Sequence, residues 1–95
     1  MSQAPEFIPL SDAAVRAVAG AGGRHAALIE DAFKVLIETP GGGVSLAGDA
    51  KGRTGARRAI ALLAERADDG HAVANAEVRA AIGQARVGDA GGGAI

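Results

Sequence analysis

Hydrophobic and polar positions divide the chain into short segments with two different periodicities. At the start, Ile8 and Leu10 fall on the same side of an extended segment, residues 6–10. Pro9 within this segment has no N–H to donate to a neighbouring strand. The pattern therefore predicts a short strand at the edge of a sheet.

Two helices are predicted next. Ser11 and Asp12 are good N-cap residues for a helix over residues 13–19, with Val15 and Val18 on its inner face. A glycine-rich break at residues 20–23 separates it from a second helix over residues 24–33. The apolar residues of the second helix form one stripe: Leu28, Ile29, Ala32 and Phe33.

A hairpin follows. Residues 34–39 are rich in β-branched and aliphatic side chains, residues 40–43 (Pro-Gly-Gly-Gly) predict a turn, and residues 44–48 alternate as a paired strand should. We expect the two strands to be antiparallel.

Two further helices complete the predicted fold. Residues 49–55 are expected to form a polar approach to a long helix that ends at Gly70. Its buried stripe is predicted to contain Ala56, Ile60, Leu63 and Ala67. Asn75 is a good cap for the last helix, and Glu77 is favourably placed in its first turn. The apolar side of the last helix comprises Val78, Ala81, Ile82 and Ala85.

The predicted order is β-α-α-β-β-α with an extra C-terminal helix. A three-stranded antiparallel sheet with helices on one face would bury both periodicities, so the fold class is α+β. We expect a single domain over residues 6–87, with flexible ends at residues 1–5 and 88–95.

Composition limits the chemistry available. The 95 residues have a formal net charge of −1 and contain two aromatic residues and no cysteine. Disulfides, thiolate metal sites and cysteine nucleophiles are therefore excluded. No signal peptide or membrane-spanning segment is visible, so we expect a cytoplasmic protein without membrane contact. The two histidines, His25 and His71, have no carboxylate spacing that predicts a metal site.

The order of elements and the glycine break resemble the K-homology (KH) domain, in its type I order. The family's Gly-x-x-Gly loop corresponds to Gly20-Ala21-Gly22-Gly23, followed by Arg24, and the family's strand ending in glycine corresponds to residues 44–48. The resemblance implies that single-stranded RNA is bound along this loop and the adjoining groove. The residues so implicated are Gly20, Ala21, Gly22, Gly23, Arg24, His25, Lys34 and Leu36.

A narrower resemblance is to the N-terminal region of PhoH-like (phosphate-starvation-inducible) ATPases. It is carried by residues 23–30 (GRHAALIE), residues 44–48 and residues 77–82 (EVRAAI). This family implies a P-loop ATPase domain later in the parent protein. Gly43 and Gly48 have P-loop spacing here, but Asp49 stands where phosphate binding needs lysine. We therefore expect no catalysis and no cofactor in this chain.

Other interpretations remain open from the sequence. The loop positions Ala21 and Gly22 are uncharged, so residues 20–23 could simply form a tight turn. His25 is expected at the turn or the surface. Arg24, His25, Lys34, Lys51, Arg53, Arg57 and Arg58 could form a basic patch, but the residues from Arg53 to Arg58 are expected to face away from the groove. The chain could thus bind single-stranded RNA, or instead serve as a protein-interaction or self-association module.

Overall fold

The sheet occupies one side of the molecule. The computed structural model describes residues 4–94 and contains three strands: β1 (Glu6–Pro9), β2 (Leu36–Glu38) and β3 (Gly43–Ala47). They pair antiparallel in the order β1-β3-β2, with Ile8 opposite Val44 and Ile37 opposite Leu46. β1 is an edge strand, as Pro9 predicts.

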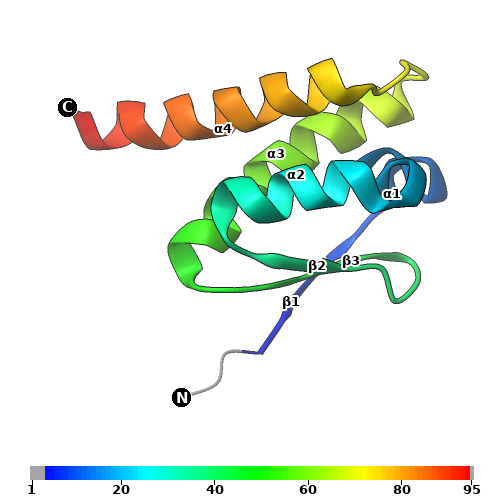
Figure 1. Cartoon of the computed structure of the whole chain (residues 1–95), viewed down its shortest axis with the longest axis horizontal. Coiled ribbons are helices and arrows are strands. Elements are labelled where there is room, and N and C mark those ends of the chain that lie inside the picture. Colours follow the sequence, from blue (N-terminus) through cyan, green and yellow to red (C-terminus); the bar gives the residue numbers. More distant parts are fainter. Residues whose placement is uncertain (1–3, 95) are drawn as a thin grey trace.

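The helices form two further layers on one side of the sheet (Figure 1). They are α1 (Asp12–Ala19), a short 3₁₀ turn η1 (Ala21–Gly23), α2 (Arg24–Phe33), α3 (Ala50–Asp68) and α4 (Asn75–Ala94). α4 packs on α2 and α3, so the middle helices separate it from the sheet. The predicted α+β order with an extra C-terminal helix is confirmed.

The core is aliphatic and continuous between the layers. Each element contributes few residues, and the alanines let the helices approach closely. Fully buried side chains include Val18, Ile29, Val44, Leu46, Ile60, Leu63 and Val78. The predicted inner residues of α4 are all buried. In α1, the predicted burial of Val18 is confirmed, whereas Val15 is only half-buried and Ala14 is the other buried residue of that face.

α3 begins at Ala50, six residues before Ala56, the first residue of its predicted buried stripe. Asp49 caps it, because its Oδ1 accepts the backbone N–H of Gly52 at 3.0 Å. Gly52 and Gly55 lie inside the helix at points where Phe33 leaves no room for a side chain. A Cβ on Gly55 would lie 2.5 Å from the Phe33 ring, and one on Gly52 would collide with the Phe33 carbonyl oxygen. The expectation that residues 49–55 form a polar approach ahead of the helix is therefore wrong, because α3 already begins at Ala50.

The ends of α2 and α4 also differ from expectation. Lys34 is not in a strand, since it ends α2 in the left-handed conformation with φ +57°. α4 continues to Ala94, beyond the predicted limit of the domain. The predicted flexibility of residues 88–95 stays a prediction, and residues 1–3 and 95 lie outside the described residues. Among the described helices, none is long and apolar enough to cross a bilayer.

Candidate nucleic-acid interface

The glycine turn between α1 and α2 has a conformation that requires glycine. Gly20, Gly22 and Gly23 have φ values of +74°, +64° and +78°. Gly23 is the N-cap of α2 and provides no side-chain hydrogen bond to the first turn of the helix. A Cβ at Gly22 or Gly23 would meet nothing within 4 Å, so the turn is open on its outer side. The N–H groups of Gly23 and Arg24 donate to the carbonyl oxygens of Gly20 and Ala21 within the turn. An external anion can therefore reach the outer side of the turn beside Arg24, rather than free N–H groups of Gly23 and Arg24.

His25 supports this turn from inside. Its side chain is buried, and its Nδ1 lies 2.7 Å from the carbonyl oxygen of Ala17. A Cβ on Gly20 would lie 2.5 Å from the imidazole Cγ. The imidazole thus ties α1 to α2, and the expectation of a surface position for His25 is wrong. The structure gives it a supporting role rather than an open face for a ligand.

Arg24 and Lys34 lie at opposite ends of α2. Both side chains are exposed, and Arg24 directly follows the glycine turn. Ten helical residues separate them by about 15 Å along the axis. The Lys34 ammonium is 3.7 Å from the Asp31 carboxylate, in a pair that is exposed to solvent. Arg24 is therefore the cation placed to neutralise a phosphate at the turn.

Leu36 does not face the same side as the turn. It pairs with Ala47, whereas Ile37, next to it, is buried against the helices. Because successive strand side chains point to opposite faces, Leu36 lies on the outer face of the sheet. Phe7 lies there as well, and the two are 54% and 49% exposed. The predicted set of eight residues is thus divided between two surfaces.

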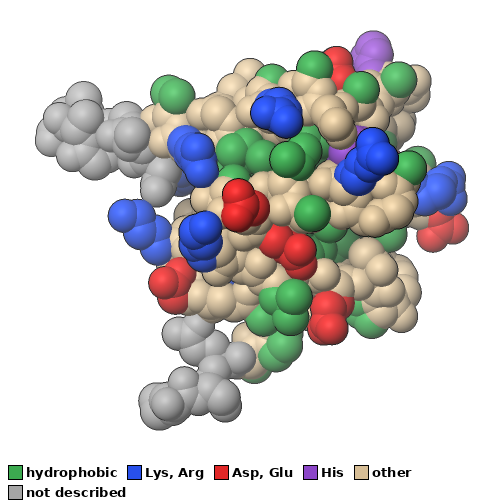
Figure 2. Space-filling model, viewed as in Figure 1, with side chains coloured by type: hydrophobic (Ala, Val, Ile, Leu, Met, Phe, Trp, Pro, Cys, Tyr) green, Lys and Arg blue, Asp and Glu red, His purple; other side chains and the backbone are tan. Residues whose placement is uncertain are grey.

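Acidic side chains border the region between α2 and β2. Oε2 of Glu30 accepts the backbone N–H of Ile37 at 2.8 Å, and Asp31, next to Glu30, is exposed. Glu38, two residues after Leu36, lies with it on the outer face of the sheet. Figure 2 shows red side chains between α2 and the hairpin, with blue ones mainly around α4 and the ends of α2. The electrostatic potential between α2 and β2 is therefore unfavourable for a polyanion.

Two of the basic residues at the start of α3, Arg53 and Arg57, are engaged within the domain. Glu6 accepts from Arg53 at 3.3 Å and from Arg57 at 2.7 Å, and the Nε of Arg53 also donates to the Gly48 carbonyl oxygen. These contacts join α3 to β1. The role of Glu6 could not be predicted from the sequence, because an ion pair between residues about fifty positions apart has no local signal.

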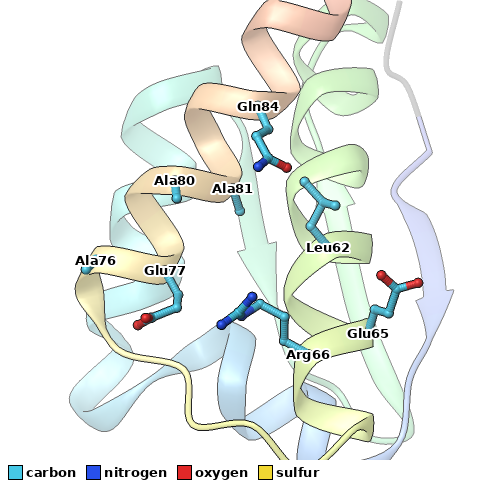
Figure 3. A pocket seen from close by; sticks show the side chains of 8 residues that line it. All are labelled: Leu62, Glu65, Arg66, Ala76, Glu77, Ala80, Ala81 and Gln84. Atoms are coloured by element: carbon cyan, nitrogen blue, oxygen red, sulfur yellow. The ribbon is translucent and has the colours of Figure 1, made fainter.

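A groove of about 300 Å³ lies between α3 and α4 (Figure 3). Leu62 and Ala81 contribute apolar surface, and the Arg66 side chain extends towards Glu77. The Glu77 carboxylate accepts the Ala74 N–H at 2.8 Å, and this bond, more than the nearby Arg66, holds the pKa of Glu77 below its ordinary value. The bond caps α4. The part of the chain that the structure describes has no cluster of three potential metal ligands.

Comparison with known proteins supports the fold. No protein-family model and no curated protein matches the chain. The structure is similar to that of Dim2p from Pyrococcus horikoshii OT3, with a TM-score of 0.66 and 21% identity over 84% of this chain. It is equally similar, by the same measures, to a chain in the complex of a/eIF2alpha, aDim2p and rRNA from the same organism.

The match spans about half of each of those proteins, 48% and 45% of their lengths. Identity at this level carries information on the fold alone. Together with the strand order β1-β3-β2, the likeness supports the predicted KH-like arrangement.

Proposed function

We propose that this chain is a KH-like RNA-binding domain that contacts single-stranded RNA weakly, with its glycine turn against the phosphate backbone. The open outer side of the turn at Gly22 and Gly23, followed by the exposed Arg24, is the observation that carries the proposal. The likeness to Dim2p, which one of the matched structures contains in a complex with rRNA, supports it.

The surroundings of the turn indicate low affinity. Lys34 and Leu36, which the KH resemblance also implicates, lie away from the turn, and the carboxylate of Glu30 opposes phosphate between α2 and β2. With no aromatic residue at the turn, base stacking contributes little. If one or two phosphates are neutralised, affinity should fall only about three- to sevenfold between 50 and 200 mM salt.

Substitution at Gly22 tests the proposal. Asn and Asp both tolerate the left-handed backbone, so Gly22→Asn and Gly22→Asp form a matched pair that differs in charge. In fluorescence anisotropy with a mixed-sequence RNA 12-mer, Gly22→Asp and Arg24→Ala should weaken binding at least fivefold, while Gly22→Asn changes it little. Equal affinity for all three variants and the wild type would exclude the turn as the RNA contact.

A second candidate function is protein interaction or self-association without nucleic acid. The exposure of Phe7 and Leu36 on the outer face of the sheet favours it. Leu36→Ser should then lower the apparent mass in concentrated solution, measured by analytical ultracentrifugation. If the wild type and the Leu36→Ser variant were both monomeric at all concentrations, self-association through this face would be excluded.

We extend the proposal to the PhoH-like resemblance. In a PhoH-like protein, the domain would bind RNA in support of a P-loop ATPase domain of the same cytoplasmic protein and would perform no catalytic step itself. The native gene beyond the codon for Ile95 tests this point. A downstream Gly-x-x-x-x-Gly-Lys-Ser/Thr sequence is expected, and a reading frame without one contradicts it.

A further inference from the structure

A second groove lies between α2 and α4, on a surface separate from the glycine turn. It has a volume of about 310 Å³ and is lined by Leu28, Asp31, Ala32, Arg79, Ile82, Gly83 and Arg86. Aliphatic side chains of both helices form its apolar part, and two arginines lie along its α4 side. The combination of apolar surface and cationic border is typical of a surface that binds an amphipathic partner.

The two arginines lie on one face of α4. They are seven residues apart, which corresponds to two turns and about 10.5 Å. Arg86 donates to the Ala32 carbonyl oxygen at 3.0 Å, and its guanidinium is 5.8 Å from the centre of the Phe33 ring. These contacts hold the guanidinium in place, and its other N–H groups can still reach a carboxylate. Within the described part of the chain Arg79 forms no ion pair.

No packing contact within the domain requires glycine at position 83, which lies between the two arginines. Gly83 is exposed in the middle of a helix, where glycine is less favourable than alanine. A Cβ built on it would meet nothing within 4 Å. The contrast with Gly55, whose Cβ would strike Phe33, shows that packing within the domain does not require Gly83. Bare backbone at this point would let another helix approach α4 closely.

One turn further along α4, Val87 is 70% exposed. It extends the apolar surface beyond the groove, on the side of Gly83. Asp31, the one carboxylate that lines the groove, is near the ammonium of Lys34, which partly offsets its charge. The charge available to a ligand is therefore mainly that of the two arginines.

We propose that the α2–α4 groove docks an acidic amphipathic helix of a partner protein. Two carboxylates of that helix, seven residues apart, would pair with Arg79 and Arg86. Aliphatic side chains beside them would cover the half-buried Leu28 and the exposed Val87, and the helix backbone would cross α4 at Gly83. This contact is independent of the proposed RNA contact at the glycine turn.

A synthetic helical peptide tests the proposal. It has two Glu residues seven positions apart on the same face as two Leu residues, and a control peptide carries Gln at both Glu positions. In ¹⁵N NMR titrations, we expect saturable shifts at Leu28, Gly83 and Ile82 with the acidic peptide, and at least fivefold weaker binding of the control peptide.

Variants of the domain complete the test. Arg79→Glu and Gly83→Leu should each weaken peptide binding at least fivefold without lowering Tm, whereas Arg16→Ala, on exposed α1 surface, should leave binding unchanged. Three results would overturn the proposal: no saturable shifts, equal binding of the two peptides, or shifts centred on the outer face of the sheet. Shifts at Arg79 and Gly83 with RNA but not with the acidic peptide would overturn it as well.

Discussion

The carboxylate of Glu30 accepts the backbone N–H of Ile37, with 2.8 Å between Oε2 and the nitrogen. Through this bond α2 satisfies an outward-facing donor of the edge strand β2. An unpaired donor at a sheet edge is a template for pairing with another chain, and the carboxylate also repels phosphate. The same side chain therefore protects the sheet edge and limits nucleic-acid affinity.

Replacement of Glu30 separates these two effects. Glu30→Ala leaves the Ile37 N–H without its partner and should cost about 1–2 kcal/mol of unfolding free energy. Glu30→Gln keeps an acceptor oxygen but removes the charge, so it should preserve most of the stability and strengthen RNA binding about twofold. Urea unfolding and anisotropy measure the two quantities. Equal stability of the Ala and Gln variants would contradict the role given to the hydrogen bond.

Gly20 and His25 should be energetically coupled. Gly20→Ala places a Cβ 2.5 Å from the imidazole in a backbone conformation, φ +74° and ψ 171°, that is almost restricted to glycine. We expect a loss of about 1–3 kcal/mol. Gly22→Ala, with open space around it, should cost about 1 kcal/mol from the backbone alone.

A double-mutant cycle measures this coupling by urea unfolding. The variant with both Gly20→Ala and His25→Ala should lose less stability than the sum of the single changes, because the collision is absent. Strict additivity would show that the ring does not restrict Gly20.

Gly55 and Gly83 are both helical glycines, and they should respond oppositely to alanine. Gly83→Ala gains helix propensity without a collision and should stabilise the domain by about 0.5–1 kcal/mol. Gly55→Ala gains the same propensity but overlaps the Phe33 ring, so a net loss of about 1–3 kcal/mol is expected. Thermal unfolding of the two variants gives the comparison. Stabilisation by both would show that Phe33 can move away from α3.

The carboxylate of Glu77 should make stability depend on acid pH. The Ala74 N–H, and to a smaller extent Arg66, hold its pKa below the ordinary value of 4.5. The unfolded chain then binds the proton first, so the contribution is complete above that value and is lost as the pH falls through the lower, folded pKa. Glu77→Gln should flatten the decline of unfolding free energy between about pH 5 and about pH 3. An unchanged slope would contradict this assignment.

The sequence was sufficient to predict the order of elements, because the apolar periodicities and breaks are local. α2 has the predicted bounds, and β1 is at the edge where Pro9 requires it. The start of α3 could not be predicted, because Gly52 and Gly55 suggest a loop unless the contact with Phe33 is known. A tertiary contact thus overrides a local preference.

The candidate site was predictable only in part. The glycine turn and Arg24 follow directly from the sequence. The face occupied by Leu36 does not, because both its neighbours are apolar and no alternation distinguishes the two sides of the strand. The burial of His25 depends on how α1 crosses α2, which no spacing along the chain indicates.

An NMR titration of the ¹⁵N-labelled domain with a mixed-sequence single-stranded RNA tests the central claim most directly. At low salt, we predict amide shifts centred on residues 20–25, weaker binding at high salt, and binding to the Gly22→Asp variant that is at least fivefold weaker. Absence of shifts at saturating RNA, or shifts at other positions that persist in Gly22→Asp, would contradict an RNA-binding role for the glycine turn.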